Sequence, residues 1–190
     1  SERQGRVEVG LRGDVESESP SRCGRLVQRQ DLLTTYKDKL LRSVGDRRLN
    51  GVPIVLDLCW GSATACAAEV FQSLGADLTV LHGQPDGERI NVACGSTQLN
   101  PLRQAVVAQG AVMGFAFDGD ADRMLAVDAQ GRVVDGDHVL YLWGSVLQDQ
   151  KALPGERLVA TVMSNLGFER AWERRGGVLE RTLVGDQHVH

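Results

Sequence analysis

The segment GFAFDGDADRMLAVD, residues 114–128, places three aspartates at alternate positions and an arginine directly after the last of them. Two carboxylates about 4 Å apart repel each other by roughly 4 kcal/mol at an effective dielectric constant near 20. If Asp118, Asp120 and Asp122 converge, a cation must offset this repulsion, whereas carboxylates that splay into water need none. The apolar residues that lead into the acids favour convergence, because a buried strand would hold the base of the loop.

Three carboxylates from one short loop suit a hard divalent cation. Mg²⁺ binds oxygen at about 2.0–2.1 Å and prefers six ligands, so three aspartates leave positions for water and a phosphate oxygen. Arg123 adds a planar fork of donors that matches phosphate. A metal ion and an arginine beside open coordination positions are typical of phosphoryl transfer.

Three alternatives to this interpretation of the loop fit the sequence less well. A calcium-binding EF-hand loop requires Gly at position six and Glu at position twelve, but counting from Asp118 gives Arg123 and Ala129. The D-x-D loop of aspartyl-phosphate phosphatases fits weakly, because those loops continue with a short polar residue in place of Ala121 and Asp122. The third alternative is a solvated acidic turn, which would bind no cation.

The segments before the loop alternate between strand and helix patterns. Apolar residues at helical spacing predict an amphipathic helix over 31–44. Further along we expect strands at 53–59, 77–82 and 112–117, with helices at 63–74 and 100–109. This order predicts an α/β fold: a mixed, mainly parallel sheet with helices on both faces. Ligands of such sheets bind beyond the carboxyl ends of the strands, which is where the aspartates lie.

A second similar α/β domain begins after the loop. A hairpin turning at 129–131 is followed by a helix at 137–149, a strand at 157–164, a helix at 165–177 and a strand at 178–186. We therefore expect a linker or ragged end over 1–22, an α/β domain over 23–131 and a partial α/β domain over 132–190. An incomplete sheet of this kind predicts exposed apolar surface around 156–184.

Local signals also predict where three of the helices begin. Ser62 or Thr64 is expected to cap the helix at 63–74. Asn100 is expected at the N-cap of the next helix with Pro101 in its first turn, and Asp137 at the N-cap of the helix that follows the hairpin.

Composition excludes several classes of partner. The 190 residues carry a formal net charge of −4, which argues against nucleic acid or a membrane surface. No apolar run approaches the ~20 residues that span a bilayer, and the first residues lack a signal-peptide core, so we expect a cytoplasmic protein. The cysteines form no C-x-x-C pair and are expected to be reduced and mostly buried: Cys23, Cys59, Cys66 and Cys94. The sequence gives no indication of an oligomeric state.

The loop FDGDADR resembles the metal loop of the α-D-phosphohexomutases, and the resemblance runs from about Cys23 to the end of the chain. The segments PDGERINVACGST and TVMSNLG are similar to the bacterial phosphoglucosamine mutase branch of that family. The final segment, VGDQHVH, resembles the start of the substrate loop in the third of the family's four domains. By this resemblance the chain covers the second domain and about the first half of the third.

The resemblance implies roles for particular residues. Asp118, Asp120 and Asp122 would hold Mg²⁺ with a phosphoserine as a further ligand, and Arg123 would bind the phosphoserine or the transferring phosphate. Gly185 and Asp186 would match the loop that faces the sugar, with Asp186 as a proton-transfer group. Many relatives have arginine where this chain has Gln187, and any charge contact of that arginine is lost here.

The implied activity is conversion of glucosamine 6-phosphate to glucosamine 1-phosphate, a step toward cell-wall precursors, through a phosphoserine and a bisphosphorylated sugar. A phosphomannomutase or phosphoglucomutase is the alternative within the family. The family's Ser-His-Asn type of serine loop has no counterpart in these residues, so we expect the chain alone to be inactive. A non-catalytic module that binds a metal or a partner, and a stand-alone phosphatase, are the alternatives outside the family.

Overall fold

The computed structural model describes residues 24–189, and the linker or ragged end expected over 1–22 lies outside the described residues. The chain separates into two units between Thr35 and Tyr36, inside helix α2 (Gln30–Ser43). The observed bounds of α2 confirm the amphipathic helix expected at 31–44. In the second unit, Lys37 of α2 forms an ion pair with Glu69.

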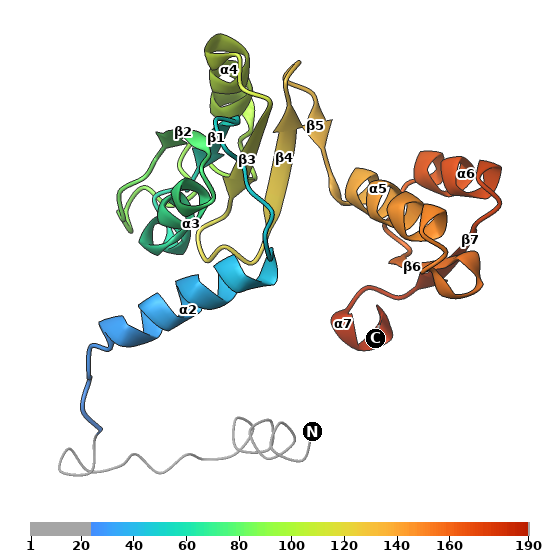
Figure 1. The fold of residues 1–190 in the computed structure, drawn as a ribbon, viewed down its shortest axis with the longest axis horizontal. Coiled ribbons are helices and arrows are strands. Elements are labelled where there is room, and N and C mark those ends of the chain that lie inside the picture. Colours follow the sequence, from blue (N-terminus) through green and yellow to red (C-terminus); the bar gives the residue numbers. More distant parts are fainter. Residues whose placement is uncertain (1–23, 190) are drawn as a thin grey trace. The chain divides into compact units, whose positions relative to one another are not determined.

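Residues 53–134 contain a mixed five-stranded sheet (Figure 1). Its strands lie in the order β2-β1-β3-β4-β5. The strand β1 pairs in parallel with β2 and β3, whereas β3–β4 and β4–β5 are antiparallel, as expected for a parallel sheet extended by a hairpin. The strands are β1 (Pro53–Asp57), β2 (Asp77–Leu81), β3 (Met113–Phe117), β4 (Met124–Asp128) and β5 (Val133–Val134).

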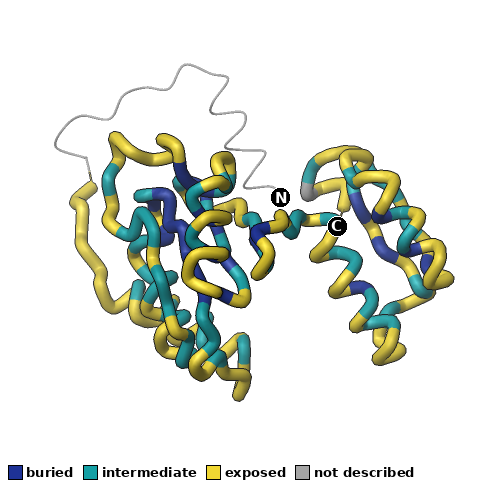
Figure 2. The backbone as a smooth tube through the Cα atoms, turned by 90° about the horizontal axis from the view of Figure 1, so that it is seen from above, coloured by how far each residue is buried: buried dark blue, intermediate teal, exposed yellow. Residues whose placement is uncertain are grey.

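Helices α3 (Ala67–Ser73) and α4 (Asn100–Gln109) cover opposite faces of this sheet. Successive side chains of a strand point to opposite faces, and β1 shows the consequence. Leu56 belongs to the apolar cluster that includes Phe71 of α3, whereas Val55 packs in the cluster of Val106 from α4. Buried positions accordingly concentrate along the strands (Figure 2). The expected α/β architecture with helices on both faces is confirmed.

The predicted start of α3 is wrong. Residues Ser62–Ala65 form a 3₁₀ turn, and the α-helix begins only after Cys66, whose φ of −150° interrupts the helical backbone. Neither Ser62 nor Thr64 caps a helix, because the Thr64 hydroxyl donates instead to the carbonyl oxygen of Gly61 at 2.6 Å. Hydroxyl side chains compete for nearby backbone groups in this way and favour turns over helices.

The expected N-cap of α4 at Asn100 is wrong by one residue. Asn100 is the first helical residue, and Leu99 occupies the N-cap without a side-chain hydrogen bond. Pro101 lies in the first turn as expected, where its missing N–H leaves no intrahelical bond unmade. The helix ends at Gly110, whose φ of 61° is the left-handed conformation that glycine adopts at no steric cost.

The C-terminal segment forms a second α/β arrangement around a two-stranded parallel sheet. Its core consists of Leu158, Ala160, Phe168 and Trp172. Both strands are shorter than expected: a turn in which Ser164 N–H donates to the Thr161 carbonyl follows β6, and a short helix follows β7. The elements are α5 (Gly136–Asp149), β6 (Arg157–Thr161), α6 (Leu166–Arg174), β7 (Val178–Thr182) and α7 (Asp186–Val189).

The expected N-cap of α5 is also wrong. Asp135 has the extended backbone of an N-cap and accepts the N–H of His138 at 3.2 Å, completing a reciprocal capping box. Asp137 lies inside the first turn, where its carboxylate accepts the backbone N–H of Asn165 at 3.0 Å and the side-chain amide at 2.7 Å. Because Asn165 caps α6 through the N–H of Phe168, Asp137 links the starts of α5 and α6.

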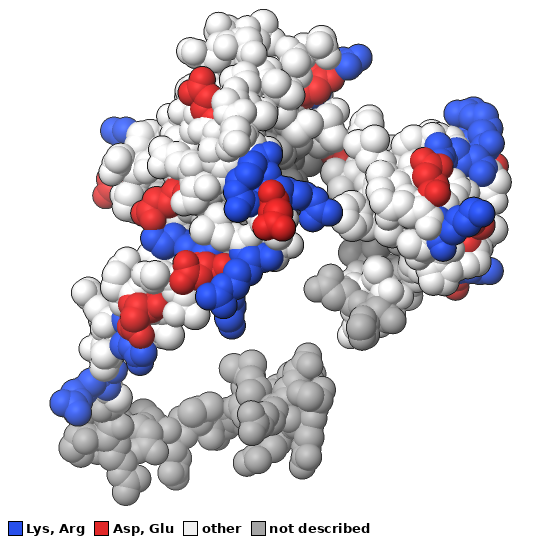
Figure 3. Space-filling view, viewed as in Figure 1, with Lys and Arg blue, Asp and Glu red and all other residues white. Residues whose placement is uncertain are grey.

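The surface of the C-terminal segment matches one further expectation from the sequence. Apolar residues with at least about half of their surface exposed occur within 156–184, as expected from an incomplete sheet: Val162, Met163, Leu166, Leu183 and Val184. Acidic and basic side chains are interspersed on the face drawn in Figure 3. Among residues 24–189, none of the helices combines the length and apolar character that crossing a bilayer requires.

Candidate metal centre

The aspartate loop joins β3 to β4 and is closed by its own hydrogen bonds. Asp118 directly follows β3 and is only 2% exposed. Its carboxylate accepts the Arg123 Nε–H at 2.8 Å and the Arg123 backbone N–H at 3.2 Å, while its own N–H donates to the Arg123 carbonyl at 3.3 Å. A buried carboxylate is costly unless it is paired and hydrogen-bonded, and this arrangement supplies both conditions.

The three acids of the loop converge, although only one of them is buried. Ala121 adopts a left-handed φ of 61° and donates its N–H to the Asp118 carbonyl at 3.2 Å, so the backbone turns sharply between the acids. One carboxylate oxygen each from Asp118, Asp120 and Asp122 lie within 4.8 Å of one another. The geometry brings together the residues that the sequence singled out; their role as metal ligands stays a prediction.

The pKa values of the loop move in opposite directions. Burial opposes the charge of Asp118, but hydrogen bonds from the Arg123 backbone and side chain and from the Asp122 carboxyl outweigh it and lower the pKa of Asp118. The pKa of Asp122 is raised, first by the hydrogen bond that it shares with Asp118, then by burial and the negative charges of Asp120 and Asp118. The loop therefore holds more negative charge than Arg123 neutralises, and a cation would relieve it.

The donor set fits a hard divalent cation such as Mg²⁺. All three side chains offer carboxylate oxygens, the ligand type that Mg²⁺ prefers, and they leave further coordination positions open. Beside them the Arg123 side chain is 75% exposed and uses only its Nε on the two neighbouring acids. Within the described residues its two terminal nitrogens have no hydrogen-bond partner, so they are available to a phosphate group.

A second cluster of polar side chains, not predicted from the sequence, lies at the carboxyl end of β1. Asp57 is completely buried and faces His82, which follows β2, and Cys94, with one ligand-type atom from each within 4.8 Å of the others. Cys59 Sγ lies 3.9 Å from Cys94 Sγ. The signal in the sequence was an aspartate within the apolar run VPIVLDLC, in the same strand-end setting as Asp118.

The thiol of Cys94 gives a direct test of this packing. Burial, then the hydrogen bond with Cys59 and the charges of Cys59 and Asp57, raise the pKa of Cys94 to about 12. Only the thiolate is nucleophilic, and a thiol with so high a pKa is almost entirely protonated at pH 8. We expect iodoacetamide at pH 8 to leave Cys94 unmodified in the folded chain while the half-buried Cys66 reacts, though slowly, because burial also raises the pKa of its thiol. Mass spectrometry of the alkylated peptides measures both sites; equal labelling without denaturant would contradict this packing.

The expected sugar-facing residues lie in the C-terminal segment. Gly185 follows β7 with a φ of 132°, a conformation that side-chain-bearing residues rarely adopt, and its carbonyl accepts the His188 N–H at 2.9 Å. Asp186 is the first residue of α7. Their roles in substrate binding and proton transfer stay predictions.

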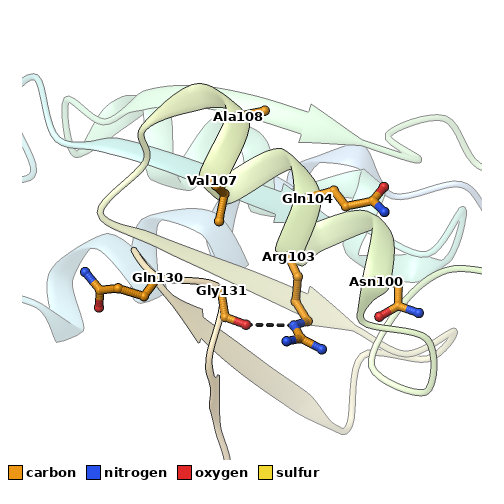
Figure 4. A pocket seen from close by; sticks show the side chains of 7 residues that line it. All are labelled: Asn100, Arg103, Gln104, Val107, Ala108, Gln130 and Gly131. Atoms are coloured by element: carbon orange, nitrogen blue, oxygen red, sulfur yellow. Dashed lines mark hydrogen bonds between the residues drawn. The ribbon is translucent and has the colours of Figure 1, made fainter.

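A hollow of about 500 Å³ lies between α4 and the turn after β4 (Figure 4). Arg103 crosses it and donates from Nε to the Gly131 carbonyl at 2.7 Å. Because Asp128 of β4 pairs with Met113 at the start of β3, this turn lies at the opposite end of the strands from Asp118. The hollow has one charged lining side chain, Arg103, and lies away from the three carboxylates, so it is not part of the candidate metal centre.

Two family models match consecutive parts of the chain. The model described as "Phosphoglucomutase/phosphomannomutase, alpha/beta/alpha domain II" matches residues 34–131, and the corresponding domain III model matches residues 135–190.

Curated relatives match over the whole chain. The protein named phosphoglucosamine mutase from Parasynechococcus marenigrum (strain WH8102) is 90% identical over 190 residues, which are 100% of this chain and 41% of that protein. The protein of the same name from Synechococcus sp. (strain CC9902) is 71% identical over 191 residues, with the same two shares. The chain therefore spans about two fifths of the length of the curated relatives that it matches.

Solved structures share the fold. A phosphoglucomutase/phosphomannomutase family protein from Burkholderia thailandensis is 27% identical with a TM-score of 0.66, over 81% of this chain and 33% of that one. A putative phosphomannomutase from Thermus thermophilus is 21% identical with a TM-score of 0.62, over 81% of this chain and 36% of that one, a likeness that concerns the fold alone.

Proposed function

Because the chain belongs to the phosphoglucomutase/phosphomannomutase family, we propose that it is part of a mutase that converts glucosamine 6-phosphate to glucosamine 1-phosphate. The choice of sugar is supported by the 90% identity to a protein named phosphoglucosamine mutase. The reaction passes through a phosphoserine and a bisphosphorylated sugar, with the serine supplied by another part of a longer protein. Within the chain we propose one domain over 23–131 and a partial one over 132–190.

The observation that carries this proposal is the convergence of three carboxylates beside an exposed arginine. Asp118, Asp120 and Asp122 hold Mg²⁺, which when bound supplies positive charge to offset that of the phosphoryl group in transfer. Arg123 binds the phosphate through its terminal nitrogens, while Asp118 fixes the guanidinium through Nε. In this arrangement the metal ion offsets the charge of the three carboxylates, and Arg123 and the metal ion together offset the charge of the bound phosphate.

The C-terminal segment contributes the sugar-facing groups in this proposal. Gly185 allows the backbone to approach the sugar closely, and Asp186 transfers a proton to or from a sugar hydroxyl. Gln187, the next residue, offers a neutral amide in place of the arginine that the family resemblance implies. The proposed substrate is a charged sugar phosphate that does not cross a bilayer unaided, so we place the enzyme with its substrate in the cytoplasm.

The test is turnover by the full-length protein that contains this chain, phosphorylated on its serine. We expect ³¹P NMR to show glucosamine 6-phosphate converting to the 1-phosphate, with loss of activity in EDTA and recovery with added Mg²⁺. Glucose and mannose 6-phosphates are expected to react at least tenfold more slowly. A protein that interconverts neither the glucosamine nor the hexose phosphates would contradict the proposal.

A phosphomannomutase or phosphoglucomutase is the second candidate, favoured by the description of the matching family models. The same experiment separates the alternatives. Faster turnover of glucose or mannose phosphate would establish this second candidate, and release of inorganic phosphate without isomerisation would indicate a phosphatase. Retained metal binding without any turnover would indicate a non-catalytic module.

A further inference from the structure

Asp57 is a completely buried acid that the proposed reaction does not use. Among the described residues, Asp57 and Asp118 are the two acids with less than a tenth of their surface exposed, at 0% and 2%. Asp118 is accounted for by Arg123 and the metal site. Asp57 lies at the end of β1, the strand next to β3, and no lysine or arginine pairs with it among the described residues. Its burial therefore calls for another explanation.

Three separate segments donate hydrogen bonds to the Asp57 carboxylate. Oδ1 accepts the backbone N–H of Cys59 at 3.0 Å and lies 2.9 Å from Nδ1 of His82, directly after β2. Oδ2 accepts the backbone N–H of Gly95 at 2.9 Å, 38 residues along the chain. Hydrogen bonds to an ionised carboxylate are stronger than neutral ones, particularly in a dry interior. The carboxylate thus ties together the turn after β1, the end of β2 and the loop over 88–97.

The turn after β1 leads directly to the aspartate loop. Cys59 and Trp60 have left-handed φ values of 55° and 57°, which residues other than glycine adopt only when their surroundings hold them. Two residues later the N–H of Ser62 donates to the carbonyl of Gly119 at 2.9 Å. Asp57 holds the start of this turn through the Cys59 N–H, and the other end of the turn holds the residue that follows Asp118.

The loop over 88–97 leads to the other side of the same aspartate. Gly95 is bound to Asp57, and the next N–H, of Ser96, donates to the carbonyl of Phe117 at 2.9 Å. Ile90 of this loop lies against Gly119 so closely that a Cβ added to Gly119 would be 2.4 Å from Ile90 Cγ2. The residues on both sides of Asp118 are therefore held by segments that converge on the Asp57 carboxylate.

We propose that Asp57 is a positioning residue that fixes the backbone on both sides of Asp118 and thereby the convergence of the three loop carboxylates. This inference rests on the proposed function of the loop as a metal site. Asp57 does not contact the metal or the phosphate; it acts through Phe117 and Gly119. Neutralising Asp57 leaves the three loop carboxylates unchanged. It weakens the hydrogen bonds that hold the backbone on both sides of Asp118, so the carboxylates are less precisely oriented.

The cluster around Asp57 serves to hold three segments together by hydrogen bonds, and we do not assign it as a second metal site. Both Asp57 oxygens already accept N–H donors. Cys94 Sγ lies 3.9 Å from Cys59 Sγ and 3.8 Å from the Arg89 carbonyl, and Cys59 Sγ lies 3.1 Å from the side-chain oxygen of Asn91. These contacts satisfy the thiols in their neutral form. A stoichiometric transition metal bound by these side chains in the purified chain would overturn this assignment.

The experiment compares two aspartate-to-asparagine variants of the 190-residue chain, with Mn²⁺ as a spectroscopic probe of the metal site. Asp57→Asn is expected to weaken Mn²⁺ binding five- to twentyfold. Asp128→Asn is the matched control, since this carboxylate also accepts two backbone N–H groups, of Gln130 and Arg132, and a side-chain N–H of Arg132. It lies at the opposite end of the strands, and its variant should bind Mn²⁺ within twofold of the wild type.

Electron paramagnetic resonance measures free Mn²⁺ at a temperature where all variants are folded, and a thermal scan records their stability. The inference is wrong if Asp57→Asn binds Mn²⁺ as the wild type does, or if both variants lose affinity in proportion to lost stability. In the full-length protein, Asp57→Asn should lower kcat with little change in the KM for the sugar phosphate, and excess Mg²⁺ should restore part of kcat.

A milder variant covers the case in which Asp57→Asn does not fold. His82→Gly removes one of the three donors to Asp57, and glycine adopts the left-handed φ of 52° at this position without strain. It is expected to weaken Mn²⁺ binding two- to fivefold, and unchanged binding would count against the inference. If the wild-type chain binds no Mn²⁺ at all, the proposed metal site is wrong and the role of Asp57 falls with it; wild-type binding matched by the variants rejects only the positioning role.

Discussion

Replacing Asp118 with asparagine is expected to lower the Mg²⁺-dependent turnover of the full-length enzyme by at least about a hundredfold, the scale of losing a metal ligand from a charged site. The same change should destabilise the metal-free chain by about 1.5–3 kcal/mol, the value of a hydrogen bond to a charged group. Asparagine keeps the volume of the side chain but leaves Arg123 without its buried carboxylate partner. The loss of activity should persist at saturating sugar phosphate.

Asp122→Asn is the comparison that separates a metal ligand from a structural acid. It removes a second carboxylate of the cluster, so it should also weaken Mg²⁺ binding. Its effect on the metal-free chain should be opposite, because Asp122 shares a hydrogen bond with Asp118 and is repelled by the charges of Asp120 and Asp118. Neutralising it should leave the metal-free chain as stable as the wild type or more stable.

The pH dependence of stability follows from the directions of these two pKa shifts. The lowered pKa of Asp118 contributes stability that is present above the ordinary value near 4 and lost as the pH falls through the lowered value. The raised pKa of Asp122 acts in reverse, so that its contribution is lost as the pH rises through the raised value. Thermal unfolding of the metal-free variants between pH 3 and 7, together with calorimetric Mg²⁺ titration, measures both effects. Wild-type Mg²⁺ affinity in Asp118→Asn would reject the metal assignment.

Gly61→Ala is expected to displace the aspartate loop without altering any of its side chains. A Cβ at this position would lie 2.3 Å from the Gly119 carbonyl oxygen and 2.9 Å from its carbonyl carbon and Cα. The obstacle is backbone, so the clash is relieved only by moving the segment that carries Asp118, which also breaks the bond from Ser62 N–H to Gly119. We expect a loss of about 2–4 kcal/mol in stability from overpacking and the lost hydrogen bond, and at least a tenfold loss of turnover.

Gly87→Ala is the matched control for this substitution. A Cβ at Gly87 meets nothing within 4 Å, and its φ lies outside the range that L residues rarely adopt. Its stability should stay within about 0.5 kcal/mol of the wild type, as is usual at open surface positions. Chemical denaturation of the chain and activity of the full-length enzyme are the measurements. If Gly61→Ala matched the control in both, the close approach of the two loops would be wrong.

The order of the elements and the aspartate loop followed from the sequence because their causes are local. Apolar spacing predicted α2, the strands of the sheet and the hairpin after β4, since periods of 3.6 and 2 residues report which face of an element is buried. Asp118 and Arg123 are five residues apart, so one loop suffices to bring them together. Local reasoning was less successful at helix starts, where Asp135 and Asp137 compete within one turn and the partner Asn165 decides between them.

The contacts that hold the aspartate loop in place depend on the tertiary structure. Asp57 meets the side chain of His82 and the backbone of Gly95 across 25 and 38 residues of sequence. Gly61 meets Gly119 because the ends of β1 and β3 are neighbours in the sheet. A spacing pattern records how one segment buries itself, whereas these contacts depend on which distant segments pack together. The sequence by itself therefore determined which residues could bind a metal, and the packing of β1, β2 and β3 decided what holds them in place.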